Sequence, residues 1–174
     1  MTQNRPGSLT FSTPPKHTGH SAASRIAMTD PTTSRVHFTL ESTLSTINKV
    51  EETANEFGQR AGFSEDDLGN ISLAAREAAV NAVMHGNKQD PAKTVDLSVE
   101  ITGEALIIRI ADQGPGFDPD SLPDPLAPEN ILRQCGRGIF LIRAFMDELK
   151  FRRLETGTEL TLIKYRKPVE QTEH

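Results

Sequence analysis

The order of the expected helices and strands restricts this fold more than any other property of the sequence. Runs with an apolar residue at every second position predict strands, and runs with apolar residues three or four apart predict helices. Two helices follow one another and two strands follow one another, so the pattern is not that of an alternating parallel sheet. We therefore expect an α+β two-layer sandwich, with helices on one face of a mixed, mostly antiparallel sheet. The expected order is strand 35–40, a helix between Thr43 and Gly62, a helix from Ser64 to about His85, strands 95–101 and 105–111, loop 112–135, helix 138–149, and strands 150–154 and 159–165.

Polar residues and glycines mark where the two consecutive helices begin and end. Ser42 or Thr43 can cap the first helix, and Gly62 ends it. Ser64 opens the second helix with a capping-box pattern, in which Asp67 replaces the stronger glutamate. The first helix is expected to bury one apolar stripe, whose members are Leu44, Ile47, Val50, Ala54, Phe57 and Ala61.

The length of the chain suits one domain with a real hydrophobic core. Of its 174 residues, 1–34 are rich in Ser, Thr, Pro and Gly and predict a disordered N-terminal tail. We expect one folded domain at residues 35–167 and a polar tail at 168–174. Met28 lies in the N-terminal tail, so translation from Met28 is an open alternative to translation from Met1.

Charge and apolar content exclude several classes of protein. The formal net charge of -5 comes from mixed acidic and basic residues without a basic run, so we expect no direct nucleic-acid partner. No apolar stretch approaches the ~20 residues of a membrane span, so we expect no membrane association. The one cysteine, Cys135, cannot form an internal disulfide and suits the reducing cytoplasm.

The second helix carries a carboxylate and an amide one turn apart, at Glu77 and Asn81. Small apolar residues surround Glu77, and an unpaired charge on such a face costs on the order of several kcal/mol. A metal, a bound water or Arg76 could compensate, which suits a general base, or Glu77 could simply pair with a basic residue on the helix flank. The amide oxygen of Asn81 suits a hard cation such as magnesium, unless it bonds a neighbouring loop. His85 continues the same stripe and is expected as a cap or core residue.

A carboxylate and two glycines stand where the most apolar strand ends. Asp112 can accept hydrogen bonds from an amino group such as that of adenine, and Gly114 and Gly116 let a ligand approach the backbone closely. The alternative is an ordinary turn, since Asp, Gly and Pro are turn residues. The proline-rich segment 112–135 shows no period, and so long an irregular segment in a compact domain is typical of a functional loop or lid.

Two more glycines flank Arg137 just before the third expected helix. Free amide groups at a helix N-terminus bind phosphate well, and Arg137 adds positive charge there. The Gly136–Gly138 pattern is a weak signal by itself. The sequence has neither a Walker-type lysine loop nor a G-x-G-x-x-G motif, which excludes the two commonest nucleotide-binding folds.

Taken in order, these motifs resemble those of the GHKL, or Bergerat, ATP-binding fold that gyrase and the histidine kinases share. Residues 77–81 with His85 and Gly86 resemble the N-box of that fold, and residues 112–117 resemble its first glycine box. Residues 136–139 resemble its second glycine box, and Gly157-Thr158 its closing threonine turn. The size of the chain is closest to the bacterial anti-sigma factor serine-protein kinases, and the resemblance covers about residues 35–166.

The resemblance implies a role for each residue of these motifs. Glu77 would be the general base acting on a protein serine, and Asn81 would bind magnesium. Asp112 would hold the amino group of adenine, with Thr158 beside it. Gly114 and Gly116 would line the base pocket, Gly136, Arg137 and Gly138 would meet the phosphates, and residues of about 118–135 would form the ATP lid.

The resemblance also implies a function, cofactors and partners. The protein would be a cytoplasmic serine-protein kinase that uses ATP and Mg²⁺, phosphorylates a STAS-type anti-sigma-factor antagonist and sequesters a sigma factor. A homodimer is implied by the family likeness alone. The alternatives are a non-catalytic ATP-binding module that only sequesters a partner, and a plain mixed-sheet domain with accidental motifs. Glu77 favours the kinase, because binding alone needs no base.

Overall fold

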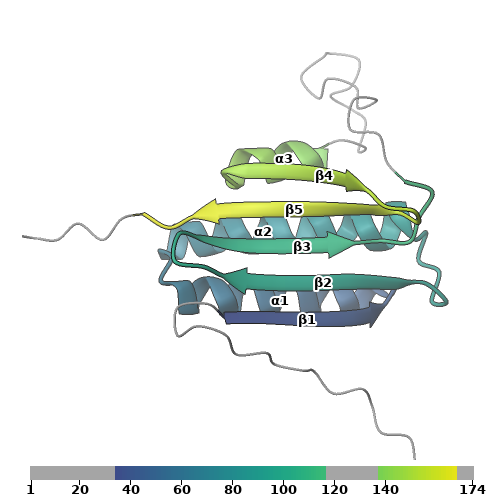
Figure 1. Ribbon diagram of the computed structural model, residues 1–174, viewed down its shortest axis with the longest axis horizontal. Helices are drawn as coiled ribbons and strands as arrows, with labels where there is room; N and C mark the ends of the chain where they lie inside the picture. Colours follow the sequence, from purple (N-terminus) through teal and green to yellow (C-terminus); the bar gives the residue numbers. More distant parts are fainter. Residues whose placement is uncertain (1–33, 117–136, 168–174) are drawn as a thin grey trace, which may run out of the picture.

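The computed structural model describes residues 34–116 and 137–167 of the chain. Within them the elements follow the expected order of strands and helices (Figure 1). The N-terminal tail, the lid at about 118–135 and the C-terminal tail that the sequence predicts lie outside these residues, except that Ser34 begins the first strand. The elements are β1 (Ser34–Glu41), α1 (Leu44–Ala61), α2 (Glu65–Val80), the π-helix η1 (Asn81–Gly86), β2 (Thr94–Ile101), β3 (Ala105–Ala111), α3 (Arg137–Phe145), β4 (Glu148–Arg153) and β5 (Thr158–Tyr165).

The strands form one five-stranded sheet in the order β1-β2-β3-β5-β4. Every neighbouring pair is antiparallel, so the sheet that was expected to be mostly antiparallel is antiparallel at each pairing. In this register Ala111 lies opposite Glu159, and Arg153 lies opposite Thr158. The end of β3, the beginning of β5 and the end of β4 therefore meet at the same end of the sheet (Figure 1).

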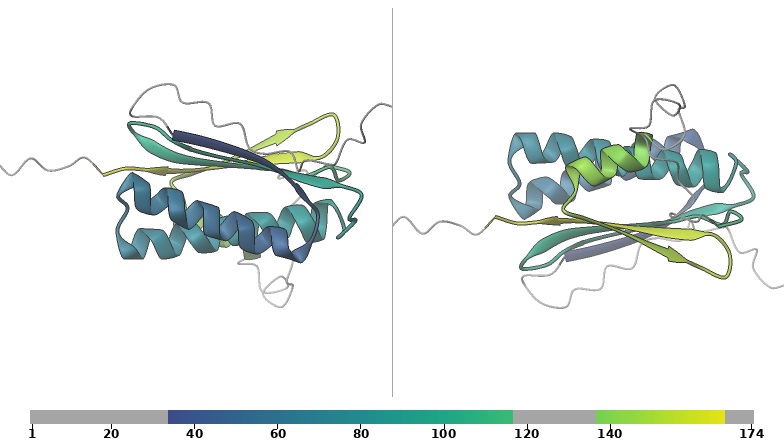
Figure 2. Two further views of the ribbon diagram at one scale, coloured as in Figure 1. Left: turned by 90° about the horizontal axis from the view of Figure 1, so that it is seen from below. Right: turned by 90° about the horizontal axis from the view of Figure 1, so that it is seen from above.

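The three α-helices of the described residues cover one face of the sheet, which confirms the predicted two-layer α+β sandwich (Figure 2). The alternating residues of β1 are more buried at every second position, as its sequence pattern predicts. On α1, the expected stripe is buried except for Leu44, which is the first residue of the helix and is 59% exposed. The helix α2 packs with small side chains, and its buried alanines are Ala74, Ala75, Ala78 and Ala79.

The helix boundaries follow the polar residues that the sequence places there. Gly62 takes the left-handed conformation, with φ 82°, and ends α1. The hydroxyl oxygen of Ser64 accepts a hydrogen bond from the backbone N–H of Asp67 at 3.2 Å, which caps α2 as predicted. Thr43 precedes α1 but forms no side-chain capping hydrogen bond.

The third helix is shorter than its sequence pattern predicts. We expected it to run to Leu149, but α3 ends at Phe145 and Glu148 already belongs to β4. The chain leaves the helix because β5 offers it partners: the backbone N–H of Asp147 donates to the carbonyl of Ile163 at 3.0 Å. Apolar spacing alone cannot detect such a boundary, because apolar residues on both sides of it pack on the same core.

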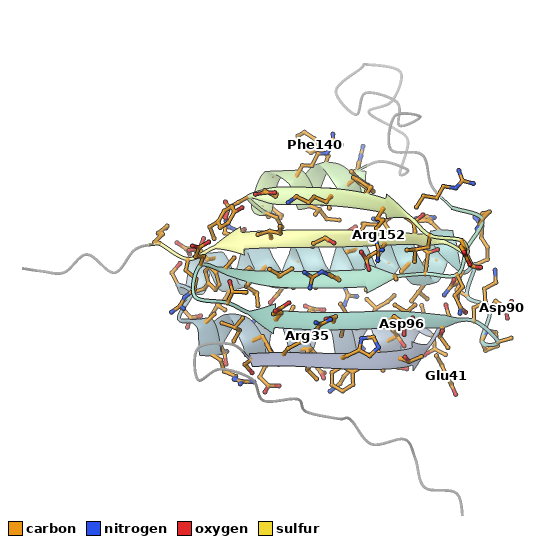
Figure 3. The ribbon with its side chains drawn as sticks, viewed as in Figure 1. Arg35, Glu41, Asp90, Asp96, Phe140 and Arg152 are labelled. Atoms are coloured by element: carbon orange, nitrogen blue, oxygen red, sulfur yellow. The ribbon has the colours of Figure 1, made fainter. Side chains whose placement is uncertain are left out.

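The second face of the sheet carries charged and polar side chains, among them Arg35, Asp96 and Arg152 (Figure 3). Many of them pair across strands. Arg152 forms two hydrogen bonds of 3.0 Å with the carboxylate of Glu159. Exposed pairs of this kind contribute only about 0–1 kcal/mol each, so they add little to the stability of the fold. In the part of the chain that the structure describes, no helix is long and apolar enough to cross a membrane.

Candidate nucleotide site

Asp112 lies at the end of β3, where the chain leaves the centre of the sheet. The residue is only 7% exposed. Its carboxylate Oδ1 accepts a hydrogen bond of 2.8 Å from the backbone N–H of Gly114, and its own N–H donates to the carbonyl of Thr158 at 3.0 Å. Burial raises the pKa of Asp112, although backbone hydrogen bonds from Gly114 and Thr158 and the charge of Lys93 lower it part of the way. A buried carboxylate of this kind can recognise a hydrogen-bond donor.

Three glycines bring backbone into contact around Asp112. A β-carbon on Gly86 would lie 2.5–2.8 Å from the carboxylate atoms of Asp112, which no real β-carbon does. A β-carbon on Gly157 would overlap the carbonyl oxygen of Asp112, and one on Gly114 would overlap the carbonyl oxygen of Gly86. The carboxylate is thus held between segments that are far apart in the sequence, and no side chain fits at these three positions.

A second group of predicted residues meets where α3 begins. A β-carbon on Gly138 would lie 2.8 Å from Oε2 of Glu77 and 3.7–3.8 Å from the amide atoms of Asn81. The first turn of α3 therefore lies against both side chains. Arg137 is exposed beside them, whereas Gly136 lies outside the described residues.

The carboxylate of Glu77 has no partner of opposite charge among the described residues. Arg76, one of the compensating groups that the sequence suggested, instead pairs with Glu51 at 2.7 Å and bonds Asn48. Within residues 34–116 and 137–167, none of the ion pairs includes Glu77. The described residues therefore do not support the alternative that Glu77 pairs with a lysine or arginine on the helix flank.

The side chain of Asn81 fits a ligand site. Its amide Nδ2 is buried and has no hydrogen-bond partner among the described residues, a situation that typically costs about 1–3 kcal/mol. Those residues contain no group of three His, Cys, Asp or Glu side chains that could hold a metal. A hard cation would bind the amide oxygen of Asn81 rather than the nitrogen Nδ2, and would take its remaining ligands from phosphate and water, as Mg²⁺ commonly does.

A π-helix joins the two groups of residues. Asn81 begins η1 and contacts the region of Gly138, and Gly86 ends η1 against Asp112. In a π-helix each turn holds more residues than in an α-helix, so the spacing of four that places Glu77 and Asn81 on one stripe does not extend to His85. His85 is exposed rather than the cap or core residue that its position in the stripe suggested.

Arg153 also lies at this end of the sheet, although no sequence pattern marks it. It ends β4 on the same face as Phe151, which packs against the core. A β-carbon on Gly116, whose φ is +88°, would lie 3.4–3.6 Å from the guanidinium group of Arg153. A single arginine at a strand end forms no recognisable pattern, so only the fold reveals this positive charge.

No site role was expected for Gly86, Gly157 or Asn87. The two glycines belong to motifs noted in the sequence, which was the available signal for them, and Asn87 directly follows the first of those motifs. The sequence could not show that Gly86 and Gly157 must be glycines. They must be, because their backbone lies so close to Asp112 that a β-carbon would collide with it.

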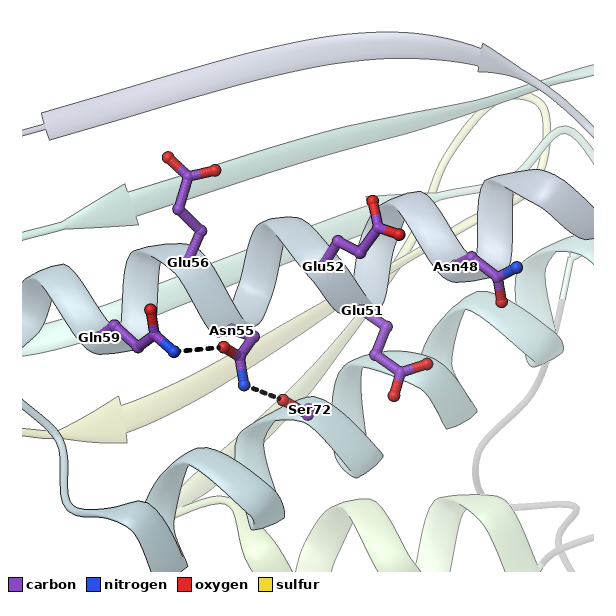
Figure 4. A pocket seen from close by; sticks show the side chains of 7 residues that line it. All are labelled: Asn48, Glu51, Glu52, Asn55, Glu56, Gln59 and Ser72. Carbon is purple, nitrogen blue, oxygen red and sulfur yellow. Dashed lines mark hydrogen bonds between the residues drawn. The ribbon is translucent and has the colours of Figure 1, made fainter.

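The structure also has an open hollow on the outer side of α1 and α2, away from these residues (Figure 4). Its lining is polar, with three glutamates and a hydrogen bond of 2.9 Å from Asn55 to Ser72. None of the predicted site residues lines it. The lining residues are Asn48, Glu51, Glu52, Asn55, Glu56, Gln59 and Ser72.

Comparisons with known proteins identify relatives of this chain. The family model described as a histidine kinase-like ATPase domain matches residues 40–164. A protein of Staphylococcus epidermidis named serine-protein kinase RsbW is 36% identical over 126 residues, which are 68% of this chain and 79% of that protein. Its namesake in Staphylococcus aureus is 32% identical over the same lengths.

One solved structure, of the RsbU and RsbW domains of a Mycobacterium tuberculosis protein, supports the fold. It aligns with a TM-score of 0.56 and 20% sequence identity. The alignment covers 77% of this chain and 33% of that longer chain. At this level of identity the likeness concerns the arrangement of helices and strands alone.

Proposed function

This chain belongs to the histidine kinase-like ATPase domain family, and on that premise we propose that it is an ATP-dependent serine-protein kinase. Both relatives described above carry the name of a serine-protein kinase. The observation that supports the proposal best is the place of Glu77: its carboxylate has no ion pair among the described residues and lies beside the first turn of α3 and the unpartnered amide of Asn81. A nucleotide-binding module without catalysis has no use for such a group.

In the proposed complex, the adenine of ATP lies at Asp112. The carboxylate accepts a hydrogen bond from the 6-amino group, and Thr158, which is buried beside it, completes the base site. Gly114 and Gly116 line the pocket, because a glycine turn leaves room for the base against the backbone. Recognition by a buried carboxylate favours a base that donates a hydrogen bond over one that only accepts.

The phosphates in this proposal lie at the beginning of α3. Gly136, Arg137 and Gly138 offer backbone N–H groups and a positive charge at a helix N-terminus, which favours anions. Asn81 would hold Mg²⁺ together with phosphate oxygens and water, and that cation would neutralise part of the phosphate charge.

Glu77 is the general base of the proposed reaction. Its carboxylate takes the proton of a serine hydroxyl on the protein substrate. The serine oxygen forms a bond to the γ-phosphorus, the bond from that phosphorus to the bridging oxygen breaks, and ADP leaves with the electron pair. The other residues of the site position the reactants and do no covalent chemistry.

The proposed protein substrate is a STAS-type anti-sigma-factor antagonist, and the proposed second partner is a sigma factor that the protein sequesters in the cytoplasm. Nucleotide state and partner choice would then be linked, because each ligand changes the affinity for the other by the same factor. The protein could act as a homodimer. Affinity capture from the source cell tests these partners, with mass spectrometry of the captured proteins and their phosphoserines; capture of neither partner would contradict the proposal.

The substitution Glu77→Gln tests the kinase against the alternative, a module that binds ATP and only sequesters a partner. We expect phosphoryl transfer to the captured antagonist to fall by about 10²–10⁴-fold, while the Kd for ATP changes less than about 3-fold. Transfer is measured with γ-labelled ATP, and binding by titration calorimetry. Glu56→Gln, on the exposed side of α1, is the matched control and should change neither. Undiminished transfer by the Glu77 variant would reject the base, and absence of transfer by the unaltered protein would favour the binding module.

A further inference from the structure

Asn87 is a buried polar residue to which none of the roles above applies. Its side chain is 0% exposed and still finds partners for both ends of its amide. The nitrogen Nδ2 donates to the carbonyl of Thr94 at 2.9 Å, and Oδ1 accepts from the backbone N–H of Gln113 at 2.7 Å. Its own backbone N–H donates to the carbonyl of Ala82 at 2.8 Å, five residues earlier. One residue thus bonds the π-helix, the beginning of β2 and the end of β3.

Gln113 closes these bonds into a ring. Its side-chain Oε1 accepts a hydrogen bond of 2.8 Å from the backbone N–H of Thr94, the residue whose carbonyl Asn87 holds. Asn87, Thr94 and Gln113 are therefore each bonded to the other two. We call these three hydrogen bonds the Asn87 ring.

The ring lies directly beside the Asp112 carboxylate. Asn87 follows Gly86, whose Cα faces that carboxylate at a distance too short for any side chain, and Gln113 follows Asp112 itself. The contact between Gly86 and Asp112 is thus flanked on each side by a residue of the ring, Asn87 after Gly86 and Gln113 after Asp112. The ring therefore ties the chain just after β3 to the π-helix on either side of the carboxylate.

We propose that Asn87 is a positioning residue that makes the site selective for adenine by holding Asp112 in place. The inference rests on the proposed function, in which Asp112 accepts the 6-amino group. Asn87 itself touches no part of the nucleotide. Its effect is expected on the recognition of that amino group alone, because in the proposed complex the phosphates lie against other residues, at the beginning of α3.

Two nucleotides separate this role from a merely structural one. ATP carries the 6-amino group, and purine riboside triphosphate lacks it but is otherwise the same molecule. Titration calorimetry on the full chain with Mg²⁺ should give about a 10-fold preference of the unaltered protein for ATP, as expected for one hydrogen bond to a charged acceptor. In Asn87→Ala we expect ATP to bind about 10-fold more weakly and the analogue to bind within 2-fold of its original Kd.

Asn55→Ala is the matched control for Asn87→Ala. Asn55 also donates one side-chain hydrogen bond and accepts another, to Ser72 and from Gln59, both at 2.9 Å (Figure 4). It lies between α1 and α2, away from Asp112. Its loss should leave the preference for ATP unchanged.

Gln113 supplies a second test, because its side chain is exposed and its truncation should therefore leave the fold intact. Gln113→Ala removes one bond of the ring and should reduce the preference for ATP about 3-fold. Gln113→Glu keeps an oxygen that accepts from Thr94 and should restore it. This arm decides the question if Asn87→Ala does not fold.

Each outcome decides between distinct explanations. Loss of ATP and analogue binding by equal factors, or an unchanged preference in both Asn87→Ala and Gln113→Ala, would overturn the positioning role while leaving the proposed function in place. If the unaltered protein bound neither nucleotide, the proposed function would fail, and this inference with it.

Discussion

The two ends of the sheet use glycine and charge in opposite ways. At the end with Asp112, glycines pack closely against neighbouring backbone. The carboxylate of Asp112 is buried there, and burial disfavours its charged form and raises its pKa. At the other end, near the turn of β2 and β3, a β-carbon on Gly103 would meet nothing within 4 Å. There Lys164 lies among partners: it donates to the carbonyl of Phe145 at 2.9 Å and lies 3.6–3.8 Å from Asp147 and Asp67. The end with Lys164 pairs its charges, which stabilises the fold. The end with Asp112 holds a buried carboxylate at a cost in stability, and that carboxylate is the one proposed to bind a ligand.

The largest expected difference between the ends concerns two glycine-to-alanine changes. Gly157→Ala places a β-carbon on the carbonyl of Asp112 in a residue with φ +94°, so it should reduce the free energy of unfolding by about 3 kcal/mol. Gly103→Ala, the control at the other end, should change it by less than about 0.5 kcal/mol. Urea denaturation followed by circular dichroism measures both. Similar losses in the two variants would remove the contrast.

The two aspartates should respond with opposite signs. Asp112→Asn removes a charge that burial disfavours, so at pH 7 it should raise the melting temperature while weakening ATP binding about 10-fold. Asp67→Asn removes the charge that pairs with Lys164 and leaves only an amide oxygen to accept from Ser64, so it should cost about 1 kcal/mol and leave ATP binding unchanged. Calorimetry and thermal melts measure the two effects. An unchanged affinity for ATP in Asp112→Asn would reject its role in adenine recognition.

Acid should weaken both stability effects. The pKa of Asp67 is lowered in the folded protein, first by the hydrogen bond from Ser64, so its stabilising contribution is present above 3.8 and is lost as the pH falls through the lowered pKa. The pKa of Asp112 is raised, so its unfavourable contribution is present at neutral pH and fades as the pH falls through the raised pKa. Melts of both variants between pH 7 and pH 3 should therefore approach those of the unaltered protein. A difference that grows in acid would contradict these signs.

The smallest expected change in the free energy of unfolding concerns Gly69, in the helix α2 at the end of the sheet where Lys164 lies. Gly69 lies inside α2 with nothing within 4 Å of the position of a β-carbon. Gly69→Ala should therefore raise the free energy of unfolding by about 0.5–1 kcal/mol, because alanine loses less backbone entropy in a helix. ATP affinity should stay the same. Destabilisation measured by urea denaturation would show that the outer side of α2 is packed more tightly than its contacts indicate.

The fold was largely predictable because local patterns and long-range packing agree in it. The alternation of β1 and the Ser64 cap of α2 are local signals, and both stand in the structure. The end of α3 was missed because pairing with β5 outweighs helical spacing there. The exposure of Leu44 was missed because an apolar stripe does not show where its helix passes the edge of the core.

Residues of the candidate site could be picked out of the sequence only where the residue type is unusual in its surroundings. Asp112 and Glu77 stand out in sequence because a carboxylate among apolar residues needs a reason. Asn87 does not, since an asparagine after a glycine usually marks a turn, and its burial depends on strands that lie seven and 26 residues away in the chain. Arg153 reaches Gly116 only through the β4–β5 pairing, which no local pattern shows.

The π-helix Asn81–Gly86 restricts how the length of this chain can vary. A π turn holds one residue more than an α turn, so deleting a single residue inside it would yield a regular helix of almost equal rise. Since each residue of an α-helix turns the chain by about 100°, that deletion would swing everything after it out of phase with Glu77. Hairpin loops such as the one at Gly103 can therefore tolerate insertions. The number of residues in η1 must instead stay constant, because it sets the orientation of everything that follows relative to Glu77.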